Sequence, residues 1–207
     1  MLRKQEVKLL ILADLNDFNQ KEVLEELNRL KRQHFDIVAV IGNTNKVMML
    51  EISLLFETAL IVALPKDHYS KAQFEELGII DFNLKKQRVD ETMIFGYGSR
   101  FYNQTAIPID KLPECFADVL ISYHAPVRIN DNPNYEHEKI DTSEINRYGA
   151  FRKPLRIFHG GRKQNKTTVL SNGTEIISCY GIVPYILKYY KEVEDETEKN
   201  EEEKGGE

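Results

Sequence analysis

Aspartate, asparagine and histidine residues follow several apolar runs of this sequence, and side chains of these types can hold metal ions. Asp14 and Asn16 come after the first apolar run, Asn43 after the second, and His124 after a later one. Carboxylate, amide and imidazole groups are ordinary ligands of divalent cations in proteins. We interpret these residues as a constellation rather than a single motif, and metal binding is the chemistry that they could carry.

Cations follow the same kind of apolar run. Lys66 comes soon after the third run, and Arg162 and Lys163 come after a run that ends in His-Gly-Gly. Such cations can bind phosphate beside backbone N–H groups without a metal. Lys66, Arg162 and Lys163 are therefore candidates for phosphate binding.

The elements that must position these residues are predicted to be buried parallel strands. Continuous apolar runs at residues 7–13, 36–42 and 59–64 are typical of strands buried on both faces. Helical patterns separate them, and this β-α-β order implies right-handed crossovers between parallel strands. In an open α/β sheet, ligands bind beyond the carboxyl ends of the strands, where these polar residues stand.

The second half of the chain is richer in β signals. Apolar runs predict strands at residues 91–99, 118–126 and 154–161, and Ser-Asn-Gly-Thr at 171–174 predicts a hairpin. Residues 127–148 are polar and are expected to form a loop or a partly helical segment. We expect one domain over residues 1–191, followed by a disordered acidic tail at 192–207.

The order of these segments resembles the calcineurin-like metallophosphoesterase family. That family carries Asp-x-His, Gly-Asp-x-x-Asp, Gly-Asn-His-Asp/Glu, a lone His and Gly-His-x-His, each after a strand. Here ADLND, IGNTN, LPKDHY, SYHAP and HGGRKQN stand in the same order. The resemblance spans residues 7–190 and implies an α/β fold, a metallophosphoesterase-like β-sandwich flanked by helices in a single domain.

Most metal ligands that the resemblance implies are replaced. Asp14 keeps the first carboxylate and His124 matches the lone histidine. Asn16 stands in place of a histidine, and Asn43 in place of the aspartate that would bridge two metals. In the last motif Gly161 and Lys163 stand where two histidines would be.

The third motif can be aligned in more than one register. Lys66 or Asp67 stands where the family has its asparagine ligand, and a shift of register could turn His68 or His159 inward. No register restores a bridging carboxylate. The site that the resemblance implies is therefore vestigial, and it consists of Asp14, Asn16, Asn43, Asp67 and His124.

No metal cofactor is expected, because amides, a glycine and an ammonium cannot replace carboxylates and imidazoles as tight ligands. Asp14 and His124 are weak candidates if a metal binds, and manganese or another divalent cation is the alternative. We expect Asp14 to cap a helix or form a salt bridge, and His124 to be structural. Lys163 could lie beside Asp14 and replace the positive charge of a metal.

Composition limits the possible partners. The 207 residues carry a net charge of −5, and the last seventeen residues hold the acidic excess, so the rest of the chain is close to neutral and gives no strong nucleic-acid signal. The first apolar run is too short for a secretory or membrane-spanning segment, so no membrane partner is expected. Two cysteines, Cys115 and Cys179, fit a reduced, cytoplasmic protein.

The resemblance leaves three functions open. The first is a catalytically inactive member that acts as a protein-interaction or scaffold module, as a retromer subunit and accessory subunits of replicative DNA polymerases do in this family. The second is a weak metal-dependent phosphoesterase that relies on Asp14, Asn16, Asn43 and His124. The third is a metal-independent nucleotide or phosphate binder. We favour the first, with a protein partner of unknown identity.

Overall fold

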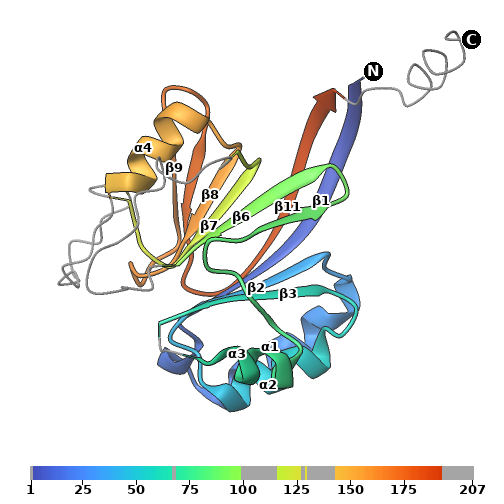
Figure 1. The fold of residues 1–207 in the computed structure, drawn as a ribbon. Helices are drawn as coiled ribbons and strands as arrows, with labels where there is room; N and C mark the ends of the chain where they lie inside the picture. Colours follow the sequence, from blue (N-terminus) through green and yellow to red (C-terminus); the bar gives the residue numbers. More distant parts are fainter. Residues whose placement is uncertain (1, 67–68, 99–115, 127–128, 130–142, 193–207) are drawn as a thin grey trace, which may run out of the picture.

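The computed structural model describes residues 2–66, 69–98, 116–126, 129 and 143–192. The predicted tail lies outside these residues, apart from Glu192 at the end of the last strand. Four layers are stacked in Figure 1: three helices, a five-stranded sheet, a six-stranded sheet and one further helix. No helix in the described part of the chain is long and apolar enough to cross a membrane.

The first sheet has the strand order β11-β1-β2-β3-β4. Its strands are β1 (Leu2–Ala13), β2 (Ile37–Gly42), β3 (Leu60–Pro65), β4 (Ile80–Asp81) and β11 (Gly181–Glu192). Strands β1 to β4 are parallel, as predicted for the first three of them, and β11 is antiparallel to β1. β1 begins at Leu2, before the predicted apolar run, because its polar first residues pair with β11.

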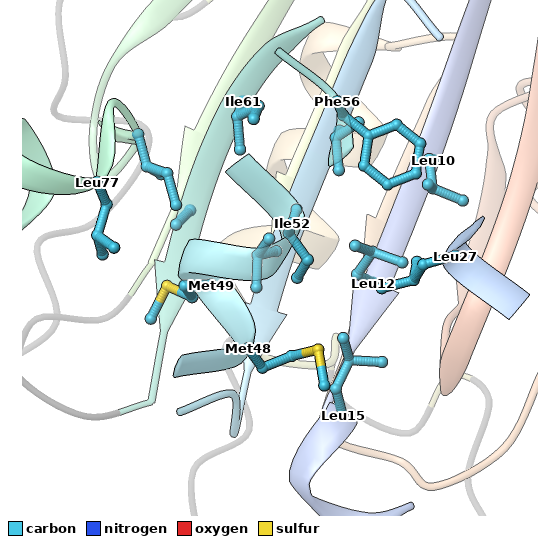
Figure 2. Close-up of a cluster of buried hydrophobic side chains, with 14 of the residues drawn as sticks. Leu10, Leu12, Leu15, Leu27, Met48, Met49, Ile52, Phe56, Ile61 and Leu77 are labelled. Atoms are coloured by element: carbon cyan, nitrogen blue, oxygen red, sulfur yellow. The ribbon is translucent and has the colours of Figure 1, made fainter. Parts of the chain in front are cut away.

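Three helices cover one face of this sheet: α1 (Gln20–Leu30), α2 (Lys46–Leu55) and α3 (Lys71–Leu77). Asn19 and Asn45 cap the first two helices, and α3 starts with a capping box of Ser70 and Gln73. Figure 2 shows side chains of these helices packed against alternate residues of the strands, such as Leu10 and Leu12.

The second sheet has the strand order β5-β6-β7-β8-β10-β9. Its strands are β5 (Lys86–Val89), β6 (Thr92–Tyr97), β7 (Val119–Ser122), β8 (Arg156–His159), β9 (Lys166–Val169) and β10 (Glu175–Ser178). β9 and β10 form the predicted hairpin. Helix α4 (Ser143–Arg152) packs on the outer face of the sheet, where Ile145 and Tyr148 are buried.

A buried apolar layer joins the two sheets. Leu9 and Ile11 of β1 lie in one cluster with Ile121 of β7 and Phe158 of β8, and all of them are fully buried. Alternate residues of β1 therefore point to opposite sides, one set towards the helices and the other towards the second sheet. This continuous core confirms the expected α/β sandwich flanked by helices in one domain.

Candidate functional site

A cavity of about 210 Å³ lies beyond the carboxyl ends of strands from both sheets. Strands β1, β2, β3, β7 and β8 all end beside it, as expected for an α/β sheet. The described residues that line it are Asp14, Asp17, Asn43, Lys66, Tyr123, His124, Ala125, Gly161, Arg162 and Lys163. The fold therefore gathers six of the residues singled out from sequence, namely Asp14, Asn43, Lys66, His124, Arg162 and Lys163.

Asp14 joins the ends of β1 and β2. Its Oδ1 accepts a hydrogen bond of 2.8 Å from the backbone N–H of Asn43. Its backbone is left-handed, with φ of 53°, and its side chain does not cap the short helix (Leu15–Asp17) that follows. The predicted capping role is therefore wrong, because this backbone turns the carboxylate towards β2.

Gly42 makes room for this carboxylate. Its φ is 78°, and a Cβ atom at this position would lie 2.2 Å from Oδ1 of Asp14. Burial raises the pKa of Asp14, and Asp17 raises it further, whereas the N–H groups of Asn43 and Gly161 and the charge of Lys163 lower it. Asp14 is thus a buried acid held by backbone donors.

Three asparagine side chains bond to one another beside Asp14, and we call Asn16, Asn43 and Asn45 the amide network. Nδ2 of Asn16 donates to Oδ1 of Asn43 over 3.0 Å. Oδ1 of Asn16 accepts from both the backbone N–H and Nδ2 of Asn45, over 3.1 Å and 2.9 Å. Oδ1 of Asn45 in turn caps α2 through the N–H of Met48. Each of the three amide oxygens already accepts a hydrogen bond.

Lys163 forms an ion pair with Asp17 at the cavity. Its Nζ lies 3.0 Å from Oδ2 of Asp17, and Tyr180 donates its hydroxyl to the same oxygen over 3.3 Å. Lys163 is also near enough to Asp14 for its charge to lower the pKa of that carboxyl, which is consistent with the expectation that the two residues lie side by side. The left-handed backbone of Lys163, with φ of 46°, orients the loop after β8.

The two histidines differ in position. His124 is buried, lines the cavity and packs its ring against Tyr123, with 4.9 Å between ring centroids. His159 is fully buried in β8, does not line the cavity, and has Nδ1 2.9 Å from the carbonyl oxygen of Gly160. Asp67 and His68, which carry the ambiguous third motif, lie outside the described residues.

Arg162 is also enclosed in the fold. Its side chain is 2% exposed, and Nη2 donates to the carbonyl oxygen of Pro126 over 3.5 Å. The guanidinium therefore places a permanent positive charge at the wall of a cavity that Asp14 and Asp17 also line. Of the three phosphate-binding candidates, Lys66 and Lys163 are exposed and Arg162 is buried.

Sequence reasoning missed Asp17 and Tyr123. Asp17 is the last residue of ADLND, and the short helix at Leu15–Asp17 brings it back beside the cavity. Its acidic type and its place after a strand were a usable signal. Tyr123 precedes His124, and nothing in the local pattern marks its ring as part of the cavity wall.

The donor groups do not fit the pair of divalent metals that the fold family implies. Asn43 gives a neutral amide where a bridging anion is needed, and the amide network already uses its oxygens as acceptors. The ammonium of Lys163 lies in the same cavity and would repel a metal ion. Among the described residues, no three His, Cys, Asp or Glu side chains form a group that could hold a metal.

No model of a known protein family and no curated protein sequence matches this chain. The fold is similar to that of TT1561 from Thermus thermophilus, at 12% identity and a TM-score of 0.56, over 84% of this chain and 89% of that one. Vps29 from Entamoeba histolytica, solved with zinc, is 11% identical with a TM-score of 0.44, over 83% and 73% of the chains. A predicted phosphoesterase from Streptococcus pneumoniae is 9% identical with a TM-score of 0.39, over 84% and 72%. The likeness to TT1561 shows the fold alone, and the expected fold class is confirmed.

Proposed function

We propose that this chain is a catalytically inactive metallophosphoesterase-like protein that acts as a protein-interaction or scaffold module. One observation carries the proposal: the amide network occupies the strand ends at which the family holds its metals. Hydrolysis by this family would need two metals to polarise the phosphate and supply a hydroxide. The residues of this chain do not fit such a pair of metals.

Asp14, the amide network and Lys163 connect loops of the fold to one another. Asp14 ties the end of β1 to the start of the loop after β2, and the amide network extends that tie to the N-terminus of α2. Lys163 ties the loop after β8 to Asp17. These contacts hold three loops together, which suits a module that presents a fixed surface.

Hydrolysis of generic phosphate esters tests whether the protein is catalytically inactive. The full chain, incubated with manganese and a nitrophenyl phosphodiester or phosphomonoester, should release nitrophenol no faster than a His124→Ala variant. A manganese-dependent rate that His124→Ala abolishes would instead establish the weak phosphoesterase.

Affinity capture tests whether the protein binds a protein partner, as a scaffold would. A tagged chain should retain a protein partner that binds again, saturably, when both are purified. Failure of every captured protein to bind in the purified assay would contradict the scaffold role.

A second candidate function, binding of a small anion without a metal, is favoured by the position of three cations. Lys66, Arg162 and Lys163 all line one cavity. Its volume of about 210 Å³ is below the roughly 300–1,000 Å³ of sites for drug-sized ligands, so inorganic phosphate suits it better than a nucleotide. The carboxyl groups of Asp14 and Asp17 also line the cavity, and their negative charge would repel an anion.

A thermal-shift titration with inorganic phosphate tests this candidate. Binding should raise Tm in proportion to the logarithm of phosphate concentration above Kd, and Lys66→Gln should remove most of the rise. Lys85→Gln, at an exposed lysine that does not line the cavity, is the matched control. An equal rise in all three proteins would be a general salt effect and would reject the candidate.

A further inference from the structure

The outer face of α2 is apolar although it is exposed. Val47, Leu50 and Leu54 are 71%, 44% and 66% exposed. They are spaced three and four residues apart, so they form one row along the helix, which we call the α2 stripe. The opposite face of α2 is buried in the core through Met48, Met49 and Ile52. The helix is therefore apolar on both sides, which is unusual for a helix at a surface.

The neighbouring helices provide an internal comparison. The exposed positions of α1 are polar, among them Lys21, Glu25 and Asn28. Those of α3 include Lys71, Glu75 and Glu76. A central apolar row between polar flanks is the arrangement of a protein–protein interface, with an apolar core and a polar rim.

A groove runs beside the stripe, between α1 and α2. It is lined by Gln20, Leu24, Asn45, Lys46, Val47, Met48 and Glu51 and has a volume of about 530 Å³. Leu24 and Met48 give it an apolar floor. It could receive an aliphatic side chain from a surface that covers the stripe.

We propose that the α2 stripe is the centre of a two-fold symmetric homodimer in which α2 of one copy lies antiparallel on α2 of the second. A two-fold contact is self-complementary, so an apolar row must meet itself. With the axis near Leu50, Val47 faces Leu54 of the second copy. The outer leucine of each α2 then lies near the groove of the other copy.

Charge favours this antiparallel arrangement. Lys46 begins α2 and Glu57 lies just beyond its carboxyl end, so antiparallel helices place each lysine near the glutamate of the other copy. A parallel arrangement would place like charges together. The helix dipoles are also opposed in the antiparallel pair.

The charges on α1 and α3 are also compatible with an antiparallel dimer about this two-fold axis. α1 has Glu22 in its first turn and Arg29 in its last. α3 begins at Lys71 and has Glu75 and Glu76 in its last turn. Stacking each helix antiparallel on its own copy brings Glu22 towards Arg29, and Lys71 towards Glu75 and Glu76, of the second copy. Within one chain Arg29 also pairs with Glu26 and Lys71 with Glu75.

The available area sets the expected strength. α1 and α2 are about 15 Å long, α3 is about 10 Å long, and neighbouring helices are about 10 Å apart. The patch that they form is therefore well below the roughly 800 Å² per partner of a standard interface. We expect a reversible dimer with a Kd on the order of micromolar.

Sedimentation of the full chain over a wide concentration range tests the proposal. We expect a monomer–dimer equilibrium, with Kd raised at least tenfold by Leu54→Glu. Val169→Glu is the matched control, since Val169 is also aliphatic and 63% exposed but lies on β9 of the other sheet. A monomer at every concentration, or a dimer unaffected by Leu54→Glu, would overturn the proposal and leave the stripe to a different protein.

A charge exchange tests the symmetry. Lys46→Glu and Glu57→Lys should each weaken the dimer, and the double variant should recover most of the affinity. Within one chain Lys46 also pairs with Glu76 at 2.6 Å, so Glu57→Lys is the cleaner single change. Failure of the double variant to recover any affinity would overturn the antiparallel arrangement.

Discussion

Asp14 stands where the resemblance would place a metal-binding carboxylate, and its contacts in the structure are hydrogen bonds from backbone N–H groups. Backbone donors at Asn43 and Gly161 hold it, and Gly42 leaves the space that it fills. The aspartate at this position matches the family's motif, but the residues at most other ligand positions do not. Identity at one position therefore says little about chemistry when the opposing groups have changed.

The close approach of Gly42 to Asp14 predicts a costly substitution. Gly42→Ala adds a Cβ atom at 2.2 Å from Oδ1 of Asp14 on a backbone with φ of 78°. We expect a loss of about 3 kcal/mol in the free energy of unfolding, measured by urea denaturation.

Gly78→Ala is the control for the backbone effect alone. Gly78 has φ of 64°, and a Cβ atom there would meet nothing within 4 Å. It should cost about 1 kcal/mol. Equal losses in the two variants would show that the carboxylate does not restrict Gly42.

The raised pKa of Asp14 predicts a dependence of stability on pH. Because burial raises this pKa above its usual 3.8, the folded state holds the proton more tightly than the unfolded state does. The free energy of unfolding should therefore fall as pH rises through the interval between 3.8 and the raised value.

Asp14→Asn lacks that titration. Urea denaturation at several pH values across the interval should show the variant gaining stability relative to the wild type as pH rises. Parallel pH profiles for the two proteins would contradict the assignment.

At the scale of elements, asparagine caps start the first two helices, but they are not equivalent. Asn19 accepts hydrogen bonds from the backbone of α1. Asn45 caps α2 and also donates to Asn16 in the amide network. The second cap is thus linked to the strand ends.

This difference predicts unequal costs for the same substitution. Asn19→Ala should lower the free energy of unfolding by about 1 kcal/mol, the usual cost of a lost cap. Asn45→Ala should cost about 2 kcal/mol, because a hydrogen bond of the network is lost as well. Chemical denaturation measures both, and a smaller loss for Asn45→Ala than for Asn19→Ala would exclude a stabilising network.

The sequence predicted the elements whose local signal agrees with their environment. Buried strands such as β2 are continuously apolar, and α3 carries both its capping box and Gly78 as a stop. β5 and β4 were missed, because β5 is polar and exposed at a sheet edge and β4 has two residues. Such strands are determined by their partners in the sheet, which local periodicity does not reveal.

At the scale of the whole molecule, the cavity depends on contacts between distant parts of the chain. The sequence predicted that Lys66, Arg162 and Lys163 follow strand ends, and in the structure all three line the same cavity. The pairing of Lys163 with Asp17 could not be read from the sequence, because it depends on how the loop after β8 turns. The positions of candidate ligands were thus easier to predict than their partners.

The two faces of the molecule suit different tasks. The cavity lies at the carboxyl ends of the strands, whereas the α2 stripe lies on the outer helical layer. Loss of metal chemistry at the cavity would leave the stripe unaffected. The proposed scaffold role and the proposed dimer can therefore be tested separately.

Metal content is the most direct test of the central claim that the site has lost its metals. The full chain would be dialysed against manganese or zinc, passed through a desalting column and analysed by elemental mass spectrometry. We predict far less than one equivalent of either metal, with no difference between the wild type and His124→Ala. Close to two equivalents in the wild type, lost in His124→Ala, would contradict the account.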